Sequence, residues 1–304
     1  MKASVIITTY NNPTYLAMVL ESLISQTHRD FEVVVCDDGS RDDTREVVSR
    51  FQGRDKPFEL LHYWHEDSSF RPGQARNGGM KAASGDWFVF IDGDILAHPR
   101  FIESHLKAAR HNRVLFGARV KLNEVFSGEL TEDLISKRGI EQIYREEFSR
   151  CREAVYSPVN DKWTDAASGK FMQRYGATRS PLAAMVWTGF CAALPRPLKW
   201  KTAFKSGSNF SAGAQIVKRV NGFDETFGVG GGEDGEFFMR LFNAGTVAWP
   251  VLFNAVAYHL YHPDNWEREG ERRDAALEIE RKTVKSGKVR CENGLAEHDY
   301  GVLR

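Results

Sequence analysis

The feature of this sequence that most limits its fold is a regular alternation of β-branched runs with amphipathic helical segments over the first 120 residues. Residues 4–9 (SVIITT) and 31–38 (FEVVVCDD) are typical of buried strands, and apolar residues at helical spacing follow Pro13. Further strands are expected at 58–64, 86–91 and 114–120, and further helices at 73–83 and 99–111. Strands that alternate with helices need crossover connections, so the pattern predicts an α/β fold with a mostly parallel central sheet flanked by helices.

Composition and charge exclude several classes of protein. The chain has 304 residues, of which 42% are hydrophobic and 27% charged, as in ordinary globular proteins. Its 41 Lys and Arg balance its 41 Asp and Glu, so no net field attracts nucleic acid. No apolar run is long enough to cross a bilayer, and MKASVIITTYNN reads as a strand entering a turn, not as a signal peptide. We therefore expect a cytoplasmic protein without a transmembrane segment. Peripheral membrane association and oligomeric state are left open.

Polar loops follow three of the predicted strands. They contain Thr8 to Asn11, Asp37 to Ser40, and Asp92 to Asp94. In parallel sheets, ligands bind beyond the carboxyl ends of the strands, so we expect these loops to share one crevice. Asp92 and Asp94 are separated by one glycine, and two like charges that close repel each other unless a cation lies between them. The sequence therefore predicts a cation site at the end of the fourth strand.

Five motifs occur in a characteristic order: SVIITTYNN, VVVCDDGSRDDT, GQARNGG, FIDGD and NGFDETFGVGGGEDGEFFMRL. In this order and spacing they resemble the family-2 glycosyltransferases of GT-A fold, over about the first 120 residues and again over roughly 187–262. The last motif also resembles the catalytic segment of β1,4-galactosyltransferases and bacterial chondroitin synthases. The resemblance implies a Rossmann-like GT-A domain in which residues 1–120 bind the nucleotide sugar and residues 121–262 form the acceptor-binding and catalytic half. Residues 263–304 are expected to be a charged, helical extension.

The resemblance implies a nucleotide pocket. Thr8 and Tyr10 would line it, although ordinary packing is the alternative for Tyr10. Asp38 would accept a hydrogen bond from the base, and a carboxylate there favours uracil because of its ring N–H, which implies a UDP-sugar. Arg76 in GQARNGG would face the phosphates or the metal-site carboxylates, with Arg71 as a second option.

The resemblance also implies a divalent cation that bridges the two phosphates. Asp94 would be the direct ligand, and Asp92 would lie close to the metal and the nucleotide. Hard oxygen ligands suit Mg²⁺ or Mn²⁺, and an imidazole from His259 would favour Mn²⁺. His262 is the competing candidate for that imidazole.

For catalysis, the resemblance implies that Asp234 is the general base and that Glu233 orients the acceptor. Acidic residues also suit the first turn of any helix, but three consecutive glycines before them favour a loop that closes over the donor. The predicted contacts to the donor or acceptor sugar are Asn209, Trp187, Gly231 and Gly232.

Together these residues predict an inverting, metal-dependent transferase that adds a single sugar from a UDP-sugar to a saccharide or glycolipid acceptor, in bacterial cell-surface polysaccharide or lipopolysaccharide assembly. The Gln-x-x-Arg-Trp motif of processive relatives is absent. Three alternatives stay open: a retaining enzyme of the polypeptide N-acetylgalactosaminyltransferase type, a nucleotidyltransferase, and a non-catalytic nucleotide-sugar-binding module. The nucleotidyltransferase is disfavoured because TTYNNP is not a phosphate-binding loop.

Overall fold

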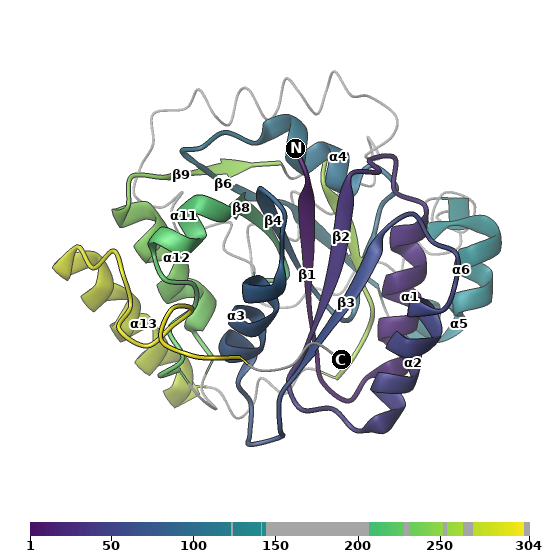
Figure 1. Ribbon diagram of the computed structural model, residues 1–304, viewed down its shortest axis with the longest axis horizontal. Helices are drawn as coiled ribbons and strands as arrows, with labels where there is room; N and C mark the ends of the chain where they lie inside the picture. Colours follow the sequence, from purple (N-terminus) through teal and green to yellow (C-terminus); the bar gives the residue numbers. More distant parts are fainter. Residues whose placement is uncertain are drawn as a thin grey trace.

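The computed structural model describes residues 1–122, 124–140, 142–143, 207–227, 231–251, 254–263 and 270–300. Its helices and strands follow in chain order (Figure 1): β1 (Ala3–Thr9), α1 (Pro13–Ile24), β2 (Phe31–Asp37), α2 (Asp42–Gln52), β3 (Glu59–Trp64), α3 (Pro72–Ala82), β4 (Trp87–Asp92), β5 (Ile95–Ala97), α4 (Phe101–Ala108), β6 (Arg113–Phe116), β7 (Ala118–Lys121), α5 (Glu124–Glu129), α6 (Glu132–Arg138), β8 (Asn209–Gly213), α11 (Ala214–Arg219), α12 (Glu233–Asn243), β9 (Val247–Pro250), β10 (Val256–His259) and α13 (Gly270–Ser286).

The described strands form a seven-stranded sheet in the order β3-β2-β1-β4-β8-β6-β9. β1 pairs in parallel with both β2 and β4, and β2 pairs in parallel with β3, which confirms the predicted α/β class. β8 is antiparallel to its neighbours β4 and β6, so the sheet is mixed at this point. The predicted crossover units therefore build one side of the sheet, and the later part of the chain completes the other.

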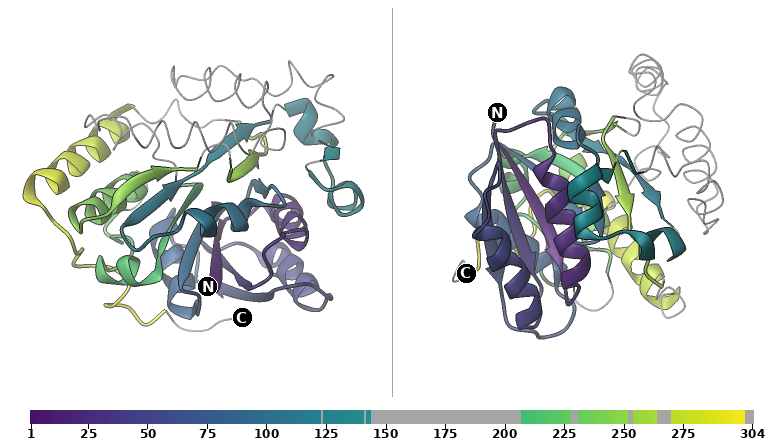
Figure 2. Two further views of the ribbon diagram at one scale, coloured as in Figure 1. Left: turned by 90° about the horizontal axis from the view of Figure 1, so that it is seen from above. Right: turned by 90° about the vertical axis from the view of Figure 1, so that its right-hand side faces the viewer.

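Helices cover both faces of the sheet (Figures 1 and 2). One face packs against α1, α2 and α4, where Leu20, Val48 and Phe101 are fully buried. The other face packs against α3, α11 and α12 through an aromatic cluster in which Phe90 and Phe210 stack with ring centroids 4.3 Å apart. Burying apolar area on two faces is the main stabilising term for such a layered fold.

The single strand predicted at 114–120 is wrong in one respect, because it is two strands in two sheets. The chain turns at Gly117, whose amide donates to the carbonyl of Asn209 (3.0 Å). A Cβ atom at Gly117 would overlap the Asn209 side chain, so the turn requires glycine. β7 then joins β5, a strand that the sequence did not predict, in a small sheet of order β5-β10-β7. This small sheet carries His259.

The C-terminal part of the described chain packs against α12 and the turn that precedes it. α13 lies beside α12, where the Asn243 amide donates to the carbonyl of Thr283 (3.0 Å). Further along, Asn221 donates to the carbonyl of Cys291 (3.0 Å), and Tyr300 donates to Glu225. The C-terminal segment thus holds the chain between β8 and α12 in place.

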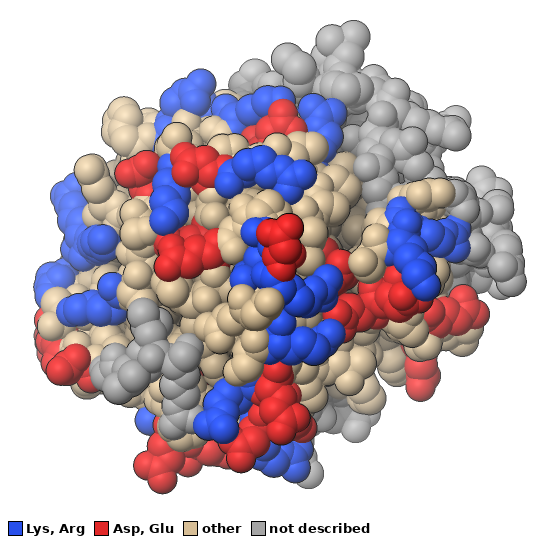
Figure 3. All heavy atoms as spheres, turned by 45° about the vertical axis from the view of Figure 1, so that its right-hand side comes forward, with Lys and Arg blue, Asp and Glu red and all other residues tan. Residues whose placement is uncertain are grey.

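Two surface properties bear on partners. Positive and negative side chains are interspersed on the face shown in Figure 3, without a large patch of one sign. Among the helices within the described ranges, none combines the length and the apolar character that a membrane crossing needs.

Candidate active site

The candidate site lies at the carboxyl edge of the large sheet, where β1 and β4 run side by side. Thr8 of β1 is the register partner of Asp92 of β4. On the other side of β1, Thr9 is the partner of Asp37, the last residue of β2. The three polar loops therefore lie at one edge of the sheet, while the crevice that they were predicted to share stays a prediction.

The guanidinium of Arg76, on α3, joins three elements at this edge. It donates from Nε to Thr8 Oγ1 (2.8 Å), from Nη1 to Glu233 Oε1 (3.0 Å) and from Nη2 to Asp92 Oδ1 (3.1 Å). Its planar group also lies over the Phe223 ring, 5.2 Å from the centroid. Arg76 is only 6% exposed. Each of its three nitrogens donates to a protein group. The sequence left open whether Arg76 faces the phosphates or the metal-site carboxylates, and in this structure it faces the carboxylates.

Loss of contact with water disfavours the ionised form of the two carboxylates that Arg76 contacts, Asp92 and Glu233. It raises the pKa of Asp92, the nearby charge of Asp94 raises it further, and Arg76 opposes both effects. Burial likewise raises the pKa of Glu233, with the charge of Asp234 adding to the effect and Arg76 again opposing it. Arg76 therefore provides the positive charge that these buried acids need in order to ionise.

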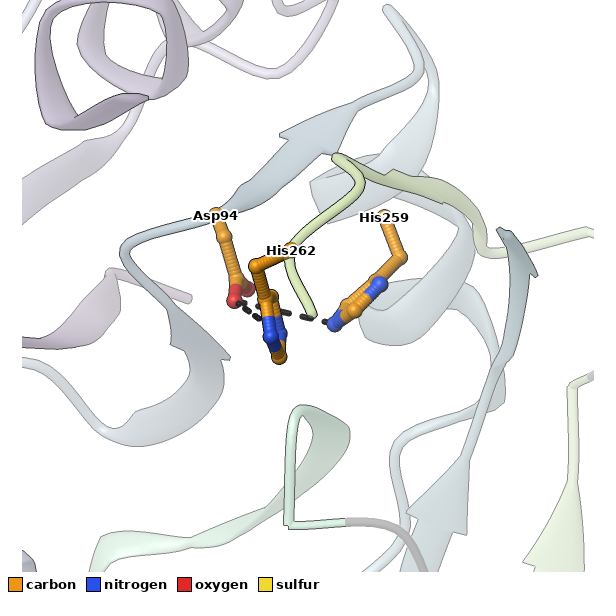
Figure 4. Close-up of side chains that lie close together, drawn as sticks. All are labelled: Asp94, His259 and His262. Carbon is orange, nitrogen blue, oxygen red and sulfur yellow. Dashed lines mark ion pairs between the residues drawn. The ribbon is translucent and has the colours of Figure 1, made fainter. Parts of the chain in front are cut away.

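Asp94, His259 and His262 converge next to this network (Figure 4). Asp94 Oδ2 lies 3.6 Å from His259 Nε2 and 3.3 Å from His262 Nε2. One ligand atom from each of the three residues falls within a 4.8 Å cluster. Asp94 Oδ1 is buried and has no hydrogen-bond partner within the described part of the chain. One carboxylate and two imidazoles around an unsatisfied oxygen fit a divalent cation.

The pKa of Asp94 is held below its usual range. Burial opposes ionisation, but the hydrogen bond from His262 and the nearby His259, His262 and Arg119 outweigh it. Asp94 is therefore an ionised carboxylate, as a metal ligand must be.

The small sheet brings these three residues together. β5 and β10 are antiparallel, with Ile95 opposite His259, and the Leu260 amide donates to the Asp94 carbonyl (2.9 Å). The turn at Gly93 is tight, because a Cβ atom there would lie 2.9 Å from Thr9 Oγ1. Residues more than 160 positions apart in the sequence thus share one site through strand pairing.

Asp234 lies in the first turn of α12, after two glycines with left-handed backbone geometry. Gly231 has φ 66° and Gly232, the N-cap residue, has φ 92°. Asp234 Oδ1 accepts from the Gly235 amide (2.9 Å), and the other carboxylate oxygen lies against Gly207, where a Cβ atom would overlap it. Asp234 is partly exposed while Glu233 is buried, so Asp234 is the more open carboxylate of the pair.

On the nucleotide side, Asp38 is 2% exposed and both of its oxygens already have partners. Oδ1 lies 2.8 Å from His65 Nε2, and Oδ2 accepts from the Arg71 amide (2.8 Å). Tyr10 is 47% exposed and donates to Asp67 Oδ2 (3.0 Å). Tyr10 is therefore not a packed core residue, and the contact of Asp38 with a base stays a prediction.

Of the predicted sugar contacts Asn209 and Trp187, the structure describes Asn209. Asn209 is fully buried, with its side-chain oxygen 3.1 Å from His105 Nε2 and its amide donating to the Ala255 carbonyl (3.1 Å). The structure therefore places Asn209 beneath the site, and this burial does not support a contact with the sugar. Trp187 lies outside the described residues.

Residues 4–154 match the family model described as Glycosyl transferase family 2. This part of the chain belongs to glycosyl transferase family 2. The resemblance to family-2 glycosyltransferases is thereby confirmed.

Relatives of this family-2 chain are named as glycosyltransferases or polysaccharide synthases. It is 42% identical over 107 residues to the validoxylamine A glucosyltransferase of Streptomyces hygroscopicus subsp. jinggangensis, which covers 34% of this chain and 25% of that protein. It is 28% identical over 272 residues to the chondroitin synthase of Escherichia coli (88% and 36%) and 25% identical over 295 residues to the hyaluronan synthase of Pasteurella multocida (92% and 27%). The family-2 chain thus spans from a quarter to just over a third of these relatives' lengths.

Solved structures confirm the predicted GT-A fold. Staphylococcus aureus TarS matches 97% of this family-2 chain with a TM-score of 0.56 and 18% identity, over 41% of the TarS chain. A mannosyltransferase from Pyrobaculum calidifontis matches 93% with a TM-score of 0.57 and 15% identity, over 64% of that chain. At these identities the likeness concerns the fold.

The sequence of this family-2 chain did not single out every residue that the structure places at the site. His262 was only a competitor for His259, whereas the structure brings both imidazoles to Asp94. Arg119 and Gly207 were not predicted. A lone arginine in the apolar run VLFGARV was the available signal for Arg119, but no local pattern indicates that Gly207 meets Asp234.

Proposed function

We propose that this chain transfers one sugar from a UDP-sugar to a saccharide or glycolipid acceptor, with inversion at the anomeric carbon and with the help of a divalent cation. The proposal depends above all on the convergence of Asp94, His259 and His262 at the carboxyl edge of a GT-A sheet. Asp94 and the two histidines would hold the cation, which would neutralise charge that develops on the leaving diphosphate.

The choice of donor rests on two observations. Structures of TarS fragments are described as complexes with UDP and with UDP-GlcNAc. The acidic Asp38 at the end of β2 is also better suited to a base with a ring N–H. The mannosyltransferase from Pyrobaculum calidifontis is described in complex with GDP-Man and Mn²⁺, so a GDP-sugar is the donor to compare.

The proposed reaction uses the two acids at the start of α12 in different ways. Asp234, the more open of the two, takes the proton of the acceptor hydroxyl as the hydroxyl oxygen bonds to the anomeric carbon. The bond from that carbon to the diphosphate oxygen breaks, and its electron pair leaves with UDP. Glu233 accepts a hydrogen bond from Arg76 through Oε1, and its proposed role is to orient the acceptor. Attack from the face opposite the leaving group inverts the anomeric centre.

Replacement of the proposed base provides the test. Asp234→Asn should lower kcat by about a hundredfold or more, because general-base catalysis contributes about 10²- to 10⁴-fold, while UDP still binds. Asp133→Asn, on an exposed ion pair of α6, is the matched control and should leave turnover unchanged. Full activity in Asp234→Asn would remove Asp234 from the mechanism. Stabilisation by UDP-sugars without any turnover in the parent protein would instead favour a non-catalytic binding module.

Stereochemistry separates the proposal from the retaining alternative. NMR of the product should show an anomeric configuration opposite to that of the donor, whereas retention would favour an enzyme of the polypeptide N-acetylgalactosaminyltransferase type. A place in cytoplasmic assembly of cell-surface polysaccharide or lipopolysaccharide rests on the family resemblance, and it stays a prediction.

A further inference from the structure

Arg119 lies at the edge of the candidate metal site and has no part in the function proposed above. It is on β7, which pairs in parallel with β10 so that Arg119 is opposite Ala257. Alternate residues of a strand share a face, so Arg119 projects from the face of the small sheet that also carries His259. Arg119 is exposed, and its Nη1 donates to Ser208 Oγ (2.8 Å).

Two further observations place the guanidinium among the acids of the site. On the face of the small sheet that Arg119 shares, His259 Nε2 lies 3.6 Å from Asp94 Oδ2. Its partner Ser208 directly follows Gly207, which lies against the Asp234 carboxylate. Arg119 is thus linked to the candidate base through Ser208 and Gly207 and shares a sheet face with a candidate metal ligand, and we expect the sugar end of a bound donor to lie between these groups.

Arg119 differs from Arg76 in what its donors can reach. Arg76 is buried, and each of its three nitrogens already donates to a protein group, on Thr8, Glu233 or Asp92. Among the described residues Arg119 makes no ion pair within 4.0 Å, and its Nη1 donates to Ser208 Oγ. A guanidinium presents several donors in a fixed plane, and one hydrogen bond to Ser208 orients that plane without using it up.

We propose that Arg119 binds an anionic oxygen of the nucleotide sugar at the sugar end of its diphosphate. The inference rests on the proposed function, because it needs a nucleotide-sugar donor. The β-phosphate is one source of such an oxygen, and it gains charge as the bond to the sugar breaks, so a guanidinium there would stabilise the transition state. The carboxylate of an acidic sugar is the other source of the same chemistry.

Affinities measured by calorimetry in the presence of Mn²⁺ test the proposal and separate the two sources. The probes are UMP, UDP, UDP-glucose and UDP-glucuronic acid, and the variants are Arg119→Gln and Arg119→Lys. Loss of a charge-assisted hydrogen bond should weaken binding about ten- to hundredfold in Arg119→Gln, with a smaller loss in Arg119→Lys. If the β-phosphate is bound, every probe except UMP loses affinity. If a carboxylate is bound, only UDP-glucuronic acid does.

Arg45→Gln, on the exposed surface of α2, is the matched control and should change no affinity. Unchanged melting temperature and circular dichroism would show that Arg119→Gln still folds. Equal affinities of Arg119→Gln and the parent protein for all four probes would overturn the inference, as would an equal loss for UMP and UDP. Failure of the parent protein to bind any UDP compound would refute the proposed UDP-sugar donor instead, so the two failures are distinguishable.

Discussion

Arg76 Nη1 donates to Glu233 Oε1 over 3.0 Å, and this contact ties α3 to the first turn of α12. The same guanidinium holds Asp92 at the end of β4 (3.1 Å). The acid that starts the predicted metal motif and the acid beside the proposed base thus share one buried cation. Their separation is set by the length of one rigid side-chain group, which keeps the two halves of the site in register.

Replacement of this shared cation should be costly. Arg76→Met leaves the buried Glu233 and the partly exposed Asp92 without their partner, and breaking a buried pair such as Arg76–Glu233 costs about 3–5 kcal/mol. Arg50→Met is the control, because Arg50 is 48% exposed and pairs with Glu132, and exposed pairs contribute about 1 kcal/mol or less. Urea unfolding of the three proteins measures the difference. Equal losses of stability in the two variants would contradict the assigned role of Arg76.

The two imidazoles beside Asp94 should both contribute to metal binding. His259→Ala and His262→Ala each remove one candidate ligand, so we expect each to weaken Mn²⁺ binding by at least tenfold. Electron paramagnetic resonance of free Mn²⁺ during titration measures this affinity without turnover. His111→Ala, at an exposed position, should not change it. Unchanged affinity in His262→Ala would leave His259 as the only imidazole ligand, as first expected.

The free energy of unfolding should fall as the pH is lowered from 6.5 to about 4, because of His105. Burial lowers the pKa of His105 from 6.5 to about 4, with a hydrogen bond to Asn209 opposing the shift. Between these values the unfolded chain binds a proton that the folded chain does not, so this contribution is complete above pH 6.5 and is lost as the pH falls to about 4. The shift corresponds to about 3 kcal/mol.

The difference between the parent protein and His105→Gln isolates this contribution, because other groups titrate in both. Denaturant unfolding at several pH values should show a flatter slope for His105→Gln between pH 4 and 6.5. Identical slopes would mean that the pKa of His105 does not differ between the folded and the unfolded chain.

Two glycines in helices should respond in opposite ways to alanine. A Cβ atom at Gly79 of α3 would overlap Cys36 Sγ, so Gly79→Ala should destabilise the fold by about 1–3 kcal/mol despite the better helix propensity of alanine. Gly128 of α5 has no heavy atom within 4 Å of such a Cβ position, and Gly128→Ala should stabilise by about 0.5–1 kcal/mol. Thermal unfolding of both variants checks the contrast, and a stabilised Gly79→Ala would contradict the close approach of α3 to β2.

The crossover half of the fold was predictable because its signals are local. In β1 and β2 the β-branched runs are buried on both faces of a parallel sheet, so they appear as continuous apolar stretches. The small sheet was not predictable in the same way. β5 has only three residues, and β7 is separated from β6 by a single glycine turn, so neither has a periodic pattern of useful length.

For the candidate site, residue type and spacing pointed to a cation at Asp92 and Asp94, and the family resemblance pointed to Glu233 and Asp234, because both signals lie in short stretches of chain. Which acid pairs with Arg76, which meets the histidines, and where Arg119 lies depend on contacts between segments far apart in the chain. Such contacts form when strand pairing and burial bring the segments together, and neither leaves a local trace in the order of residues. Asn209 is a further example. It was predicted to contact the sugar, but in the fold its side chain is buried and pairs with His105 and the Ala255 carbonyl.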